Sequence, residues 1–103
     1  MTFARIWRGR TSRENAAAYE DLLGSTILPG IDRIRGFRGA ELFRRDVGDE
    51  VEFMTVTRFD SLDAVREFAG DDYEQAVISD EAHRLLSSFD ERVAVYELAF
   101  EDD

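Results

Sequence analysis

The chain begins with a pattern of apolar and polar residues that predicts a strand followed by a helix. Phe3 to Arg10 is rich in branched and aromatic residues, as strands are. From Arg13 to near Leu28, apolar residues recur every three or four positions and form the buried stripe of a predicted helix. Thr11 and Ser12 stand between the two segments, where a hydroxyl can cap the first turn of that helix.

Two extended segments follow, and their spacing predicts a hairpin. Pro29 and Gly30 interrupt the helical pattern, and Gly36 ends it after one more short turn. Phe37 to Asp46 and Val51 to Phe59 are then joined by a short link that contains Gly. We expect these two runs to pair as neighbouring antiparallel strands.

The last part of the chain predicts helices and one more strand. Ser61 caps a helix that Gly70 ends, and Tyr73 to Phe89 has the spacing of one or two short helices. Ala94 to Phe100 alternates as a strand does. The predicted order is strand, helix, strand, strand, helices, strand. This is the ferredoxin-like βαββαβ arrangement, an α+β fold whose four-stranded antiparallel sheet carries helices on one face.

Both faces of the predicted strands are apolar. In the strand Val51 to Phe59, Val51 and Phe53 alternate with Met54 and Val56. A sheet with one face in water would alternate more cleanly between apolar and polar residues. Because this chain has helices for one face only, we expect a second copy to cover the other face, so that two sheets meet in a homodimer.

Composition narrows the class of protein. The 103 residues predict one domain, 1–103, with an acidic tail from about residue 100. The absence of Cys excludes disulfides and thiolate metal sites. A net charge of -10 disfavours binding to nucleic acid. No apolar run is long enough to span a membrane, and the first residues lack the core of a signal peptide, so we expect a cytoplasmic protein.

Four stretches carry a family resemblance: FARIWRGR, PGIDRIRGFRGAELFRR, FMTVTRFDSLDAVREFAGDDYEQAV and SDEAHRLLSSFDERVAVYEL. Through them the chain resembles the antibiotic biosynthesis monooxygenase-like family, of the dimeric α+β barrel superfamily, with a tail typical of an uncharacterised bacterial branch. The resemblance implies a homodimer in which two sheets form a shared barrel with the helices outside. It also implies a small pocket between sheet and helices that receives a flat aromatic molecule or a heme.

Three aromatic residues are predicted ligand contacts. Trp7 lies in the middle of the first strand, where its indole can stack on an aromatic substrate or donate one hydrogen bond. Tyr73 follows the break at Gly70 and stands at a predicted pocket mouth. Phe68, late in the preceding helix, is the third. Packing in the core or at a dimer interface is the alternative for Trp7.

Two residues are predicted to take part in catalysis. His83 is the only His, and its ordinary pKa near neutrality suits a general base. Arg58 lies in an otherwise apolar strand and can stabilise an anionic oxygen. The alternative for Arg58 is a cross-strand ion pair with Glu41, Glu52 or Glu97.

The resemblance implies cofactor-independent oxygenation of a small aromatic, phenolic or quinol compound. No motif for a nucleotide, nicotinamide or metal is present, and we predict no cofactor. The first strand lacks the Asn of the resembled oxygenases, which favours the alternative of a noncatalytic ligand-binding or structural homodimer. Heme degradation is a third alternative, although Val77 stands where the heme-degrading branch has its His ligand.

Overall fold

The structure is a computed structural model that describes residues 1–102, and its frame is one antiparallel sheet. The strands are β1 (Phe3–Ser12), β2 (Phe37–Val47), β3 (Glu50–Phe59), β4 (Leu86–Phe89) and β5 (Ala94–Glu97). They lie in the order β2-β3-β1-β4, and β5 pairs with β1 beyond the end of β4. The central strand β1 therefore has β3 along one edge and two short strands along the other.

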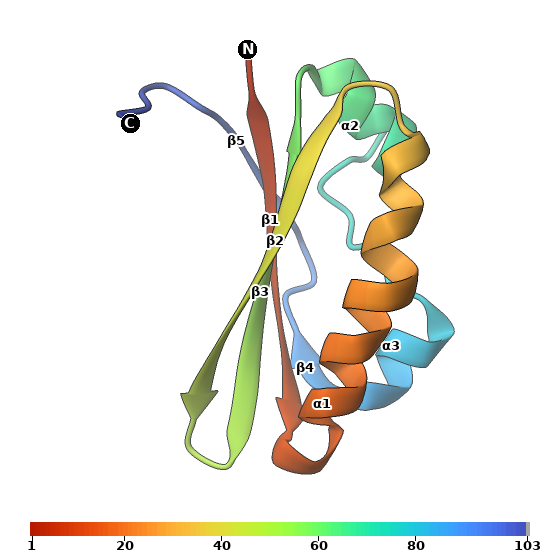
Figure 1. Cartoon of the computed structure of the whole chain (residues 1–103), viewed down its shortest axis with the longest axis vertical. Helices are drawn as coiled ribbons and strands as arrows, with labels where there is room; N and C mark the ends of the chain where they lie inside the picture. Colours follow the sequence, from red (N-terminus) through yellow and green to blue (C-terminus); the bar gives the residue numbers. More distant parts are fainter. Residues whose placement is uncertain (103) are drawn as a thin grey trace.

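All the helices lie against one face of this sheet (Figure 1). They are α1 (Arg13–Leu22), α2 (Leu62–Ala69) and α3 (Asp80–Leu85). Each begins at a serine whose hydroxyl accepts a backbone N–H: Ser12, Ser61 and Ser79. After α1 the chain stays helical but widens into a π-helical segment, Leu23–Ile27, and then tightens into a 3-10 helix, Leu28–Arg33. No helix among residues 1–102 is both long and apolar enough to cross a membrane.

The core lies between the sheet and the helices in two clusters. One is centred on Tyr19, from α1, and Phe53, from β3, whose ring centroids are 4.9 Å apart. The other is centred on Phe59 and Val65, and Phe59 is fully buried. The ferredoxin-like α+β fold and the hairpin predicted from the sequence are confirmed. Val51 and Phe53, which the alternation puts on one face of their strand, lie on the helix-facing side.

The predicted helical piece Tyr73 to Phe89 is only partly correct. Residues 80–85 form α3, but Leu86–Phe89 is the strand β4. The reason is the length of β1, which runs to Ser12 rather than to the expected Arg10 and so leaves a longer edge of N–H and C=O groups to be paired. The last strand also ends earlier than expected, at Glu97.

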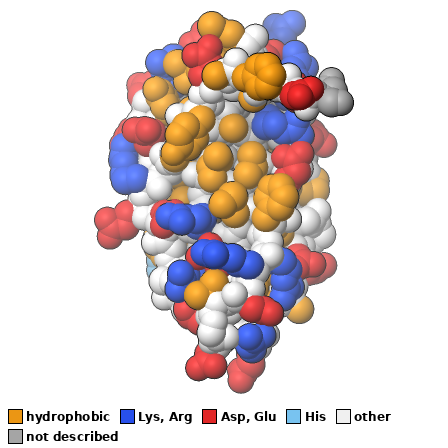
Figure 2. All heavy atoms as spheres, turned by 90° about the vertical axis from the view of Figure 1, so that its left-hand side faces the viewer, with side chains coloured by type: hydrophobic (Ala, Val, Ile, Leu, Met, Phe, Trp, Pro, Cys, Tyr) orange, Lys and Arg blue, Asp and Glu red, His pale blue; other side chains and the backbone are white. Residues whose placement is uncertain are grey.

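The opposite face of the sheet carries no helix in the part of the chain that the structure describes (Figure 1), and apolar side chains gather at its centre (Figure 2). The register puts Ala4, Ile6, Met54, Val56, Ala94 and Tyr96 on this face, which we call the open face. Tyr96 is 61% exposed, and Phe43 on β2 is 55% exposed. Such a patch on a free surface is typical of an interaction site.

Candidate functional site

A cavity of about 60 Å³ lies between the sheet and the helices. Its floor is the helix-facing side of β1 and β3, and its walls come from the helical segment after α1, from α2 and from the stretch before α3. Val77 and Ser79 line it and are also exposed, so the cavity opens to solvent beside them. Residues far apart in the sequence therefore share one hollow.

Three aromatic side chains line the cavity: Trp7, Tyr19 and Phe68. Trp7 is held in place because its indole N–H donates to the carbonyl oxygen of Asp90 at 2.6 Å. Its ring also packs against Phe89, with centroids 5.9 Å apart. Flat rings on several sides favour a flat ligand.

The wall beside α1 is built by the change of helix type. Leu23 and Ile27 belong to the π-helical segment, and Leu28 and Ile31 to the 3-10 helix that follows. Pro29 occupies the first turn of the 3-10 helix, where its missing N–H costs nothing. π-helical turns are frequent at functional sites. Here the widened turn supplies apolar side chains to the cavity.

Arg5 brings a charge into the floor of this cavity. It is only 7% exposed, and its guanidinium donates to the backbone carbonyls of Gln75 at 2.8 Å and Tyr73 at 3.3 Å. Its Cζ lies 5.2 Å from the centre of the Phe68 ring. Burial lowers the pKa of Arg5 from its ordinary value to about 10, so the side chain is still charged at neutral pH.

Hydroxyl groups complete the polar part of the lining. Thr57 donates to the carbonyl oxygen of Arg5 at 3.4 Å, and Thr55 lines the floor next to it. Tyr19 is 1% exposed, and burial raises the pKa of its phenol to about 12, so it is a hydrogen-bond donor at neutral pH. The cavity thus offers donors to a ligand oxygen.

The predicted ligand contacts divide between the cavity and its surroundings. Trp7 and Phe68 line the cavity, whereas the Tyr73 side chain lies in the second core cluster with the guanidinium of Arg66 over its ring. Tyr73 reaches the site through its backbone carbonyl, which accepts from Arg5. The roles of these residues in binding stay predictions.

The two predicted catalytic residues lie outside the cavity lining. His83 is exposed on α3, with its ring centroid 5.5 Å from that of Phe89. Arg58 pairs with Glu41 across β2 and β3 at 2.6 Å, which is one of the ion pairs that the sequence offered as an alternative. The structure therefore does not bring His83 or Arg58 together with Trp7.

Sequence reasoning missed Arg5 and Tyr19 as candidate site residues. The signal for Arg5 was its position two residues before Trp7. Residues two apart in a strand face the same side of the sheet, so a site that includes Trp7 also has Arg5 on its side. Tyr19 was assigned to the buried stripe of the first helix, which is correct, but a buried stripe does not reveal a cavity.

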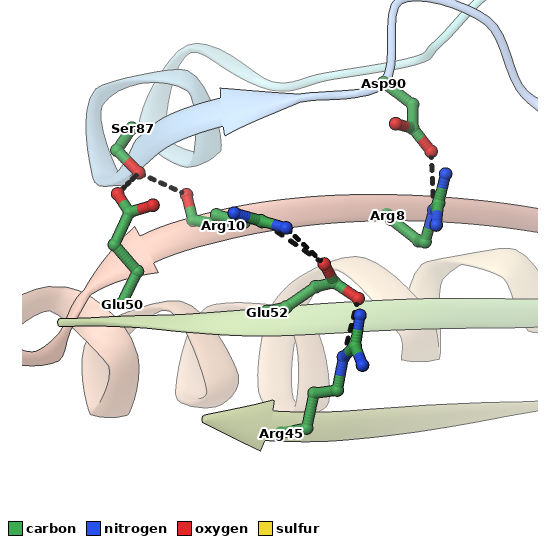
Figure 3. A network of polar contacts seen from close by, with 7 residues as sticks. All are labelled: Arg8, Arg10, Arg45, Glu50, Glu52, Ser87 and Asp90. Atoms are coloured by element: carbon green, nitrogen blue, oxygen red, sulfur yellow. Dashed lines mark hydrogen bonds and ion pairs between the residues drawn. The ribbon is translucent and has the colours of Figure 1, made fainter. Parts of the chain in front are cut away.

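A polar network borders the apolar patch of the open face (Figure 3). Glu52 is 7% exposed and accepts from both Arg45 and Arg10, at 3.1 and 3.2 Å. The hydrogen bond from Arg45 is the main cause that holds the pKa of Glu52 below its ordinary value. Nearby, Arg8 pairs with Asp90 at 3.0 Å. These charges satisfy one another beside the apolar patch.

Comparisons with known proteins identify one family and several solved structures with a similar fold. Residues 2–80 match the family model described as antibiotic biosynthesis monooxygenase. A solved Mycobacterium tuberculosis protein is 23% identical with a TM-score of 0.63, covering 100% of this chain and 98% of that one. A Shewanella oneidensis protein is 25% identical with a TM-score of 0.66, covering 92% and 88%. A Bacillus cereus protein, named as a candidate antibiotic biosynthesis monooxygenase, is 17% identical with a TM-score of 0.67, covering 99% and 97%. No curated protein matches the chain.

Proposed function

This chain belongs to the antibiotic biosynthesis monooxygenase family, and on that premise we propose that it oxygenates a small phenol or hydroquinone without a bound cofactor. The observation that carries the proposal is the cavity between sheet and helices, whose lining combines flat rings with a few hydrogen-bond donors. Such a lining orients an aromatic ring and stabilises negative charge on its oxygen.

The reaction needs no reductant other than the substrate. A hydroquinone loses a proton, and the resulting anion donates electrons from its ring to O₂. One oxygen atom enters the ring and the other leaves as water, so that hydroquinone and O₂ become hydroxyquinone and water. The substrate supplies all the electrons, and the protein contributes orientation and charge stabilisation.

The size of the cavity favours a substrate with one ring. An engineered cavity that binds benzene has a volume of about 150 Å³, and the cavity here has about 60 Å³. A ligand with one ring therefore fits only if a wall of the cavity moves outward. The stretch Val77–Ser79 forms no helix or strand, and Val77 is 56% exposed, so this part of the wall can move with the smallest loss of packing. Fused ring systems would require a larger rearrangement.

Heme degradation fits this site poorly. A porphyrin is several times larger than the single ring that already requires widening, and Val77 rather than a His lines the mouth. His83 lies on the outer side of α3, next to Phe89.

One observation favours the second candidate, a noncatalytic ligand-binding protein. Among the described residues that line the cavity there is no Asp, Glu or His, so no side chain there is an obvious general base. A protein that only binds phenols needs no base. Measuring turnover and binding with the same compound separates the two candidates.

We also propose that two copies associate through their open faces, as the family resemblance implies. Apolar residues from β1, β3 and β5 line this face, and Ile6 and Val56 lie opposite each other at its centre. Light scattering tests the association. We expect Val56→Arg to halve the mass of the wild-type particle and the surface variant Glu67→Arg to leave it unchanged; a monomeric wild type would overturn the proposal. The cytoplasmic location stays a prediction.

Oxygen uptake with hydroquinone tests the proposed reaction. We expect a rate above protein-free autoxidation and a product with one more oxygen and two fewer hydrogens. Thr55→Leu, which fills the cavity, should lower the rate, whereas Arg38→Gln, whose ion pair with Asp60 is exposed, should keep it. Rates of His83→Ala and Arg58→Gln test their predicted roles. A rate equal to autoxidation, or a Thr55→Leu rate equal to wild type, would contradict the proposal.

A further inference from the structure

Arg5 is the only charged side chain in the lining of the cavity, as far as residues 1–102 are concerned. It is the third residue of β1 and lies on the helix-facing side, opposite Thr57 of β3. The helices cover this side of the sheet (Figure 1), and Arg5 is only 7% exposed, so its guanidinium has little contact with bulk water. Its charge therefore acts inside the cavity.

No carboxylate balances this charge. Most of the other arginines form ion pairs with Asp or Glu, including the exposed Arg38 and Arg92. Arg5 forms none with any residue among 1–102, and its two acceptors are the neutral carbonyls of Tyr73 and Gln75. A buried charge without a counter-ion is costly, and a site that keeps one is prepared for an anion.

The lining also limits how a ligand can become an anion. It contains hydroxyls, from Tyr19, Thr55 and Thr57, but no carboxylate or imidazole in the part of the chain that is described. A phenol in the cavity thus has no protein base to take its proton. Its ionised form must instead be favoured by the charge of Arg5, which lowers the pKa of a neighbouring acid.

We propose that Arg5 is the oxyanion-binding residue of the cavity, and that the ligand is a single-ring phenol or hydroquinone bound as its phenolate. The phenolate oxygen lies against the guanidinium, and the ring lies between Trp7 and Phe68. This inference rests on the proposed function for the identity of the ligand. The sequence suggested Arg58 as the residue that stabilises an anion, and this proposal gives that role to Arg5.

4-Nitrophenol tests the proposal without oxidation chemistry, because its phenolate absorbs visible light and its phenol does not. We expect saturating protein to move the titration midpoint of the bound probe down by about one to three pH units. Nitrobenzene, which has the same ring but no oxyanion, should bind at least about tenfold more weakly. An unchanged midpoint, or no binding of 4-nitrophenol by the wild type, overturns the proposal.

Variants of Arg5 separate charge from packing. Arg5→Gln should lose the midpoint shift and about tenfold or more in affinity, whereas Arg5→Lys, which keeps the charge, should retain part of both. Arg38→Gln removes an exposed arginine and should behave as wild type. Wild-type affinity and midpoint in Arg5→Gln would overturn the role of Arg5. The wild-type titration decides the question even if a variant fails to fold.

The outcomes also separate this proposal from the reaction. A lowered midpoint without oxygen uptake supports anion binding by Arg5 and rejects oxygenation. Oxygen uptake that is the same in Arg5→Gln and wild type supports oxygenation and rejects the role of Arg5.

Discussion

Replacing Arg5 with Met should change the stability of the folded protein only slightly, although it removes the residue that we expect to bind the ligand. Burial lowers the pKa of Arg5 from its ordinary value to about 10. Because one pKa unit corresponds to about 1.4 kcal/mol, keeping the charge inside costs on the order of 3 kcal/mol. Met has a similar length and no charge. The two hydrogen bonds that it loses come from a charged donor and are worth about 1.5 kcal/mol each, so their loss offsets the relief of the buried charge.

Urea unfolding at neutral pH, followed by far-UV circular dichroism, measures this difference. The matched control is Arg38→Met, which removes an exposed arginine from an exposed ion pair and should change the free energy of unfolding by less than about 0.5 kcal/mol. If Arg5→Met is destabilised by more than about 1 kcal/mol, the reasoning is refuted, because the guanidinium would then be a net source of stability.

Three further predictions concern stability. Glu52→Gln should make the stability of the protein depend less on pH in the acid range. The pKa of Glu52 is lowered on folding, so its contribution to wild-type stability is present above about pH 4.5 and is lost as the pH falls through the folded-state pKa. Urea unfolding at pH 7 and pH 3 measures the difference between the two proteins. Burial raises the pKa of Tyr19, so the wild type has a contribution to its stability below about pH 10 that it loses as the pH rises through about 12. Tyr19→Phe should remove this dependence of stability on pH, which urea unfolding at pH 9 and pH 11 measures. Gly9→Ala should cost less than about 1 kcal/mol, because its Cβ would lie 2.8 Å from Cδ2 at the end of the Leu86 side chain, which can turn aside; a fall in melting temperature of more than about 8 °C would refute this.

The elements that local pattern determines were predictable from the sequence. The caps at Ser12 and Ser61 and the hairpin depend on residues close in the chain, and the structure has each where the sequence predicts it. The strand Leu86–Phe89 was not, because its conformation depends on the free edge of β1, which lies more than seventy residues away. The π-helical turn after Leu22 likewise has no sequence pattern of its own.

The candidate site was less predictable than the fold. Trp7 and Phe68 were chosen as aromatic residues at particular positions, and both line the cavity. Deciding which arginine can bind an anion required knowing which acidic residues lie nearby. Arg58 forms an ion pair with Glu41, whereas Arg5 donates only to backbone carbonyls. One sequence contains that information only through the folded arrangement of distant residues.

The alternation of β1 makes this strand unusually sensitive to insertions and deletions. Arg5 and Trp7 face the cavity, whereas Ala4 and Ile6 face the open side. Gain or loss of a single codon before Arg5 that shifts the strand by one residue would exchange the two sets. A guanidinium and an indole would then enter the apolar patch, and two aliphatic side chains would enter the cavity. Ligand binding and self-association would fail together, so relatives that keep both properties should differ in β1 by substitution rather than by length.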